Sequence, residues 1–149
     1  MRITLVTTTV ARTWPGTLHP IHTLLLAGSV PLFLGALLSD IAYAISYEIQ
    51  WTNFAAWLIT GALVFSGLAL LCAAIGWFRF GRHQGRTCLY PLLLLVTWVL
   101  GFINALVHAK DAWAAMPAGL ILSIIVAVLI SAAAWIGLTG CGCRAGGAK

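Results

Sequence analysis

The chain has 149 residues, of which 62% are hydrophobic and only 7% are charged. A soluble globular domain carries about 25% charged residues, so this composition and the mean hydropathy of +1.03 exclude an ordinary soluble enzyme. We interpret the net charge of +5 as a feature of membrane topology and not as a nucleic-acid-binding surface.

Four long uncharged runs predict four membrane-spanning helices. Each run reaches or exceeds the roughly 17–25 residues that a helix needs to cross the hydrocarbon core. The predicted helices cover about residues 20–47, 54–78, 87–109 and 115–138, and residues 139–149 are predicted to form a loose glycine-rich tail. An open sheet cannot satisfy its backbone in lipid. We therefore expect a single domain over residues 1–149, an all-α integral membrane protein built as an antiparallel four-helix bundle.

Basic residues are strongly biased to one side of this predicted bundle. With four spans, both termini and the loop between the second and third helices share a side. That side holds seven of the eight basic residues: Arg2, Arg12, Arg79, Arg82, Arg86, Arg144 and Lys149. The other side holds only Lys110. Because cytoplasmic loops carry the excess of Lys and Arg, both termini are predicted to be cytoplasmic.

Several polar residues fall at one depth inside the predicted helices. Asp40 lies about seven residues from the outer end of the first helix, or roughly 10 Å at 1.5 Å per residue. The other members of this polar layer are Thr60, Asn104 and Ser123, with His108 one turn further out than Asn104. A carboxylate at this depth needs partners or a proton. Two interpretations stay open: a hydrogen-bonded clamp from Asp40 to Asn104, and a proton or substrate site that includes His108.

Three histidines gather at the opposite, inner end. His19 and His22 are three positions apart at the start of the first helix and so share a face. His83 lies in the basic loop that returns to the same surface. This set is a candidate for cofactor binding, as a divalent metal site or as haem ligands, with contact to lipid headgroups as the alternative. No motif assigns a catalytic residue, and the metal and cofactor stay undetermined.

The entry to the first helix resembles a known family. His19-Pro20-Ile21-His22, followed by Pro31 and Asp40, is similar to the opening of the bacterial membrane family called domain of unknown function 2231. The resemblance covers roughly residues 17–140. It implies a redox-linked membrane role, because members occur beside or fused to Rieske centres and sugar dehydrogenases. The family usually has a histidine near the inner end of its third helix, where this chain has Tyr90-Pro91.

These observations together favour an accessory or anchor subunit of a redox (electron-transfer) assembly in the bacterial inner membrane. We expect it to contact lipid and other membrane or redox subunits and no nucleic acid, and we expect no catalysis by the chain alone. The aromatic residues expected on its outer faces are Phe33, Phe65, Trp98 and Phe102. One alternative is a small transporter or proton-linked carrier that uses Asp40, Asn104 and His108. Another is a membrane oxidoreductase that handles haem b or quinone.

Overall fold

The computed structural model describes residues 20–80, 89–110 and 112–139. Its helices are α1 (Pro20–Ser46), α2 (Ile49–Phe80), α3 (Leu89–His108), α4 (Ala112–Ala115) and α5 (Ala118–Thr139). All but the short α4 are long and apolar enough to cross a membrane, and the described residues contain no strand. The predicted four-helix, multi-pass membrane protein is thereby confirmed.

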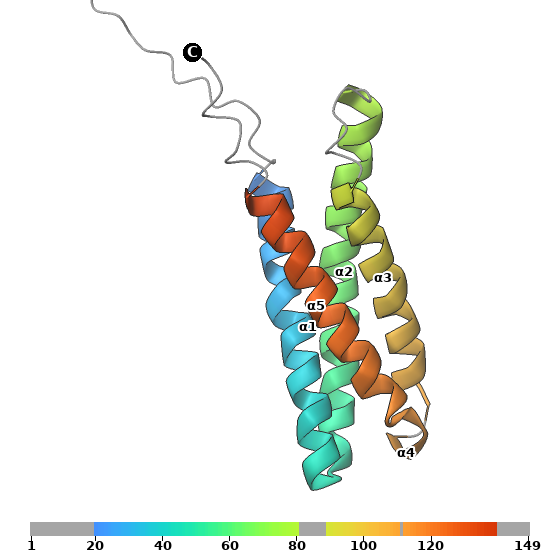
Figure 1. Ribbon diagram of the computed structural model, residues 1–149. Helices are drawn as coiled ribbons and strands as arrows, with labels where there is room; N and C mark the ends of the chain where they lie inside the picture. The colour runs from blue at the N-terminus through green and yellow to red at the C-terminus, as the bar shows by residue number, and fades with distance from the viewer. Residues whose placement is uncertain (1–19, 81–88, 111, 140–149) are drawn as a thin grey trace, which may run out of the picture.

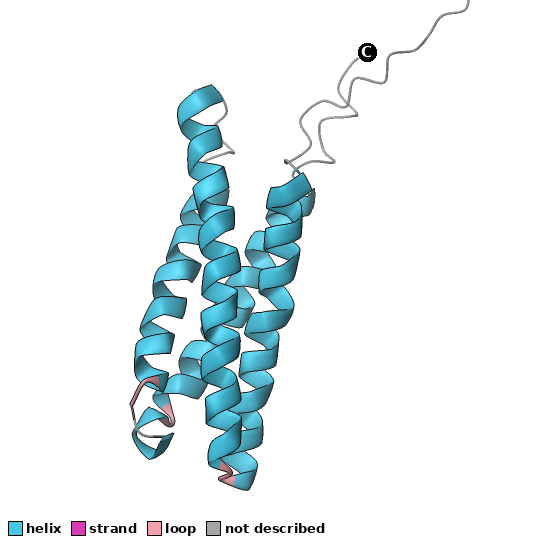
Figure 2. Cartoon of the chain, turned by 180° about the vertical axis from the view of Figure 1, so that it is seen from behind, coloured by secondary structure: helices cyan, strands magenta, loops and turns pink. Residues whose placement is uncertain are grey.

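The spanning helices follow one another up and down the bundle (Figure 1). Only Tyr47 and Glu48 separate α1 from α2, so residues 49–53, which lie ahead of the second helix expected from the sequence, are helical. Tyr47 has a positive φ of 57°, a left-handed conformation that reverses the chain. Its N–H bonds to the carbonyl of Tyr43 at 2.8 Å. The tight connection holds α1 and α2 side by side, as the view from behind also shows (Figure 2).

Each spanning helix packs against two neighbours, so that α1 and α3 each contact both α2 and α5 and lie diagonally across the bundle. Buried side chains on α1 recur at steps of three and four residues: His22, Leu26, Ser29, Phe33, Ala36, Asp40 and Tyr43. On α3 the same steps give Leu94, Thr97, Gly101, Asn104 and His108. A mean spacing of 3.5 residues is the pattern of left-handed, coiled-coil-like packing.

Contacts across the diagonal between α1 and α3 share one register. His22 meets Tyr90, and Asp40 meets His108. In both pairs the residue numbers differ by 68, as they also do for Phe33, whose ring lies against Gly101. A constant difference means that the two helices run parallel without slippage. This register places polar groups of α1 opposite polar groups of α3 at both ends of the bundle.

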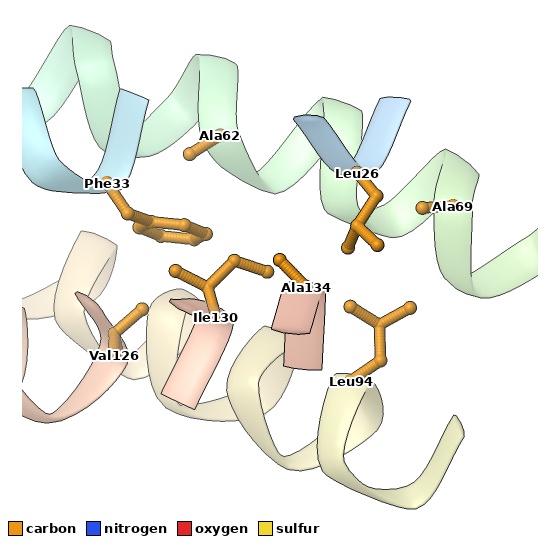
Figure 3. Close-up of a cluster of buried hydrophobic side chains, with 8 residues drawn as sticks. All are labelled: Leu26, Phe33, Ala62, Ala69, Leu94, Val126, Ile130 and Ala134. Atoms are coloured by element: carbon orange, nitrogen blue, oxygen red, sulfur yellow. The ribbon is translucent and has the colours of Figure 1, made fainter. Parts of the chain in front are cut away.

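The middle of the bundle is apolar (Figure 3). Its buried cluster consists of Leu26, Phe33, Ala62, Ala69, Leu94, Val126, Ile130 and Ala134. The alanines of the cluster let the helices approach closely. The ring of Phe33 points into the cluster (Figure 3). Phe33 is only 2% exposed, so its expected place on an outer face is wrong. The step of seven residues from Leu26 puts it on the buried face of α1.

The outward faces carry large apolar side chains and contact the lipid bilayer. Phe65 and Phe102 are exposed there, as the sequence predicts. Trp98 is half-buried, and its indole N–H donates to the carbonyl of Leu63 at 3.1 Å. The indole reaches that carbonyl because Gly67, one turn later on α2, has no side chain to cover it: a Cβ there would lie 2.9 Å from Trp98 Nε1.

Candidate functional site

The candidate site is centred on Asp40, a fully buried carboxylate in α1. Its Oδ1 lies 2.8 Å from His108 Nε2, and its Oδ2 accepts a hydrogen bond from the hydroxyl of Ser123. Asn104 in turn donates from Nδ2 to Ser123 Oγ at 2.8 Å. These four residues, from α1, α3 and α5, are called the Asp40 cluster below. All four are buried.

The orientation of His108 determines where its hydrogen lies. Nδ1 is 3.0 Å from the backbone oxygen of Asn104. A carbonyl oxygen only accepts, so Nδ1 carries a hydrogen. Nε2 then shares one further proton with Asp40, because two lone pairs facing each other at 2.8 Å would repel. The pair is either imidazolium with carboxylate or neutral imidazole with carboxylic acid, and its net charge is zero in both forms.

A glycine on α5 makes room for this arrangement. The ring of His108 lies against Gly119, where a Cβ would come within 2.9 Å of Cε1. That distance is too short for any larger residue unless the ring moves. Gly119 and Ser123 are four residues apart and so lie on one face of α5. The first admits the imidazole and the second contacts the carboxylate, so α5 closes the cluster.

The shared proton matters because it keeps the buried pair of Asp40 and His108 neutral. A charged group within a bilayer-spanning segment is costly, and such groups mark functional sites by default. With its proton the Asp40–His108 pair is neutral. Without it, a net charge of −1 stays buried between α1, α3 and α5, none of which carries a Lys or Arg residue within its described bounds. The Asp40–His108 pair is therefore expected to retain its shared proton.

The hydrogen bonds of the cluster leave one acceptor unused. Asn104 is fully buried, and its Oδ1 has no hydrogen-bond partner. An unsatisfied buried polar group costs about 1–3 kcal/mol. Its amide nitrogen, by contrast, begins a row of donors that runs through Ser123 to Asp40.

The structure brings together four of the five residues of the polar layer expected from the sequence. Asp40 and Asn104 are linked through the hydroxyl of Ser123, and His108 is a direct partner of Asp40. Thr60 lies elsewhere: it is exposed on α2, and its hydroxyl donates to the carbonyl of Ala56 at 2.8 Å. Matching depth did not ensure that it faces the interior.

A second polar contact lies at the other end of the bundle. His22 Nε2 is 2.7 Å from the hydroxyl of Tyr90, and the two rings meet edge to face with centroids 5.8 Å apart. Sequence reasoning did not assign Tyr90 to a site. His19 and His83, the other members of the predicted histidine set, lie outside the described residues. Within the described part of the chain, no group of three His, Cys, Asp or Glu side chains could hold a metal ion.

The two described histidines are too far apart to share a haem. His22 lies beside Tyr90, which precedes His108 on α3 by 108 − 90 = 18 residues. At 1.5 Å per residue this is about 27 Å along the helix. Ligation of one haem iron by both imidazoles would need them on either side of a single macrocycle.

Comparison with known proteins places the chain in a family. Residues 18–141 match the family described as "Predicted membrane protein (DUF2231)". Neither a curated protein nor a solved structure matches the chain. Because the match covers all four candidate membrane spans, the chain belongs to the DUF2231 family of predicted membrane proteins.

Proposed function

We propose that this protein is a small proton-linked carrier whose exchange site is the Asp40 cluster. The observation that carries the proposal is the buried pair of Asp40 and His108, which shares one proton at 2.8 Å. Intramembrane carboxylates and histidines are typical of proton relays in pumps and transporters. Ser123 and Asn104 would hold the carboxylate in place while the proton is exchanged.

Loss of the shared proton would change both the charge of the Asp40–His108 pair and the packing of α1 against α3. Asp40 is on α1 and His108 is on α3, and these helices are diagonal in the bundle. With the proton between them, the two side chains attract. Without it, a carboxylate lone pair faces an imidazole lone pair, so the contact between α1 and α3 weakens. A carrier alternates between two conformations, and the bound ligand must change the balance between them. Here the protonated and deprotonated forms of the Asp40–His108 pair would favour different packing of α1 against α3.

Proton entry into liposomes tests this proposal. Purified protein is reconstituted with a pH-sensitive dye inside, and a potassium gradient with valinomycin drives protons inward. We expect faster acidification than in empty liposomes and loss of the excess rate in Asp40→Asn, which keeps the shape but removes the titratable acid. Ser123→Ala should slow entry. Ser131→Ala is the matched control, because Ser131 is exposed on the same helix and its hydroxyl bonds only to the carbonyl of Ala127.

Two results would contradict the proposal. One is a wild-type rate no faster than that of empty liposomes. The other is an Asp40→Asn rate equal to that of the wild type, which would show that protons enter by a route that does not use the cluster.

A second candidate function is an accessory or anchor subunit of a redox assembly in the bacterial inner membrane, with both termini cytoplasmic. The outer surface supports it. Trp57 is 72% exposed on α2, and on α3 the rings of Trp98 and Phe102 stack at an interplanar angle of 8°. Exposed aromatic side chains on the outer faces suit helix packing with a partner subunit. That the partner would be a redox protein rests on the family resemblance described in the sequence analysis.

Mass measurement in a mild detergent tests the second candidate. We expect the protein, expressed in its native host, to migrate as a complex well above its 15.9 kDa, together with a subunit that carries a redox cofactor. Trp57→Ala should weaken the complex without unfolding the bundle, because the side chain lies outside the core. Recovery of the wild-type chain as a lone 15.9 kDa monomer would contradict this function.

A further inference from the structure

We propose that the proton route of the carrier continues from the Asp40 cluster through the middle of the bundle, and that the ring of Phe33 is the barrier that closes this route. The inference rests on the proposed function and adds its regulation. Beyond Phe33 the route reaches three fully buried hydroxyl groups, which are called the hydroxyl layer below. Its members are Ser29 on α1, Ser66 on α2 and Thr97 on α3.

The packing register places the hydroxyl layer at one depth. Ser29 and Thr97 differ by 68 residues, the same difference that joins Asp40 to His108. Contacts between α1 and α2 have residue numbers that sum to 93, as in Gly28 with Phe65, Leu32 with Gly61 and Gly35 with Leu58. By this sum Ser29 lies opposite residue 93 − 29 = 64. That position is two residues, or about 3 Å of helix rise, from Ser66.

The hydroxyl layer can accept hydrogen bonds inside the bundle. Each of its hydroxyls donates at 2.7 or 2.8 Å to a backbone carbonyl of its own helix, and these carbonyls belong to Leu26, Ala62 and Leu93. A hydroxyl oxygen also has two lone pairs, which accept hydrogen bonds. Water inside a protein needs polar partners of this kind. The layer is therefore a place where water that carries a proton could be held.

Phe33 separates the hydroxyl layer from the Asp40 cluster. It lies on the buried face of α1, four residues after Ser29 and seven before Asp40. Its ring points into the apolar middle of the bundle (Figure 3), and Cζ lies 3.2 Å from the place that a Cβ on Gly101 would take. Apolar constrictions gate pores by excluding water. With the ring in this position, the two polar regions are kept apart.

The barrier and the Asp40 cluster belong to the same contact between α1 and α3. Asp40 meets His108 two helical turns beyond the place where Phe33 meets Gly101. Under the proposed function, loss of the shared proton weakens the contact between these helices. A wider gap between them frees the ring of Phe33 and admits water beside Gly101. The charge of the Asp40–His108 pair thereby regulates whether the route is open.

Proton entry into liposomes, measured as for the proposed function, tests the barrier. Phe33→Ala removes the ring, so we expect entry several-fold faster than in the wild type. In Phe33→Ala/Asp40→Asn the rate should return to that of empty liposomes, which distinguishes the route from a general leak. Phe33→Ala/Gly101→Leu refills the space from α3 and should slow entry again. Phe102→Ala is the matched control, because Phe102 is exposed and its loss should leave the rate unchanged.

A second variant tests the hydroxyl layer without opening a cavity. Thr97→Val keeps the shape of the side chain and removes the hydroxyl, so it should slow proton entry both in the wild type and in Phe33→Ala. Thr60→Val is its control. Thr60 is exposed on α2 and bonds within its own helix, so the rate should stay the same.

The outcomes separate this inference from the proposed function. If entry depends on Asp40 but either Phe33→Ala or Thr97→Val keeps the wild-type rate, the inference is wrong and the proposed function stands. If the wild type does not exceed empty liposomes while Phe33→Ala carries protons through Asp40, the barrier is supported and the carrier function is wrong. If neither exceeds empty liposomes, both proposals fail. Should Phe33→Ala not fold, a wild-type rate in Thr97→Val overturns the inference by itself.

Discussion

Asp40→Leu and His108→Leu are each expected to destabilise the bundle by about 2 kcal/mol, while the double variant should lose far less than the sum of the two. Single interhelical hydrogen bonds in membranes average only about 0.6 kcal/mol, whereas breaking a buried ion pair from one side costs about 3–5 kcal/mol. The single variants should fall between these values, because the partner left behind can become neutral but keeps unmet hydrogen bonds in a dry interior.

A double-mutant cycle measures this coupling. Unfolding in mixed micelles with increasing denaturing detergent gives the free energy of unfolding for the wild type, both single variants and Asp40→Leu/His108→Leu. Residues in direct contact show interaction energies of about 0.5–3 kcal/mol. Thr60→Val serves as the control, since Thr60 is exposed and bonds within its own helix; its effect should be near zero. Strictly additive losses from Asp40 and His108 would show that the pair is not coupled.

The sequence predicts the composition of the Asp40 cluster better than its shape. Counting residues along each helix gives depth, and depth alone selects Asp40, Asn104, Ser123 and Thr60. It says nothing of which way a side chain faces. The buried positions of α2 recur at steps of three and four, and this series passes through Ile59 and Ala62 and so omits Thr60. The heptad pattern was present in the sequence and would have excluded Thr60.

The contact between His22 and Tyr90 was harder to predict. Tyrosines are common at membrane interfaces, so the presence of Tyr90 near a helix end does not by itself indicate a site. Its pairing with His22 depends on the register of α1 against α3, two helices that do not follow one another in the chain. No local pattern fixes that register. It emerges from the packing of both helices on α2 and α5.

The position of Phe33 leads to the second large expected effect. Phe33→Ala should lower the free energy of unfolding by about 2–3 kcal/mol, somewhat less than the roughly 3–5 kcal/mol that the same substitution costs in a soluble core. In lipid the transfer of apolar surface contributes little, because lipid tails are as apolar as the protein core. What remains is the cavity, and the ring of Phe33 is 2% exposed and central to the buried cluster. Phe102→Ala is the control, since Phe102 is 46% exposed and should cost much less.

A rescue variant distinguishes a lost volume from a lost specific contact. Across the diagonal, Phe33 lies against Gly101, whose missing side chain leaves the space that the ring fills. In Phe33→Ala/Gly101→Leu the volume returns from α3, at the same level of the bundle, so we expect about half of the lost stability to be regained in the same unfolding assay. Gly101→Leu alone should destabilise, because its Cβ would already lie 3.2 Å from both Phe33 and Leu63, and overpacking costs about 1–3 kcal/mol. If the double variant is no more stable than Phe33→Ala, then α1 and α3 do not keep the fixed register on which the Asp40–His108 contact also depends.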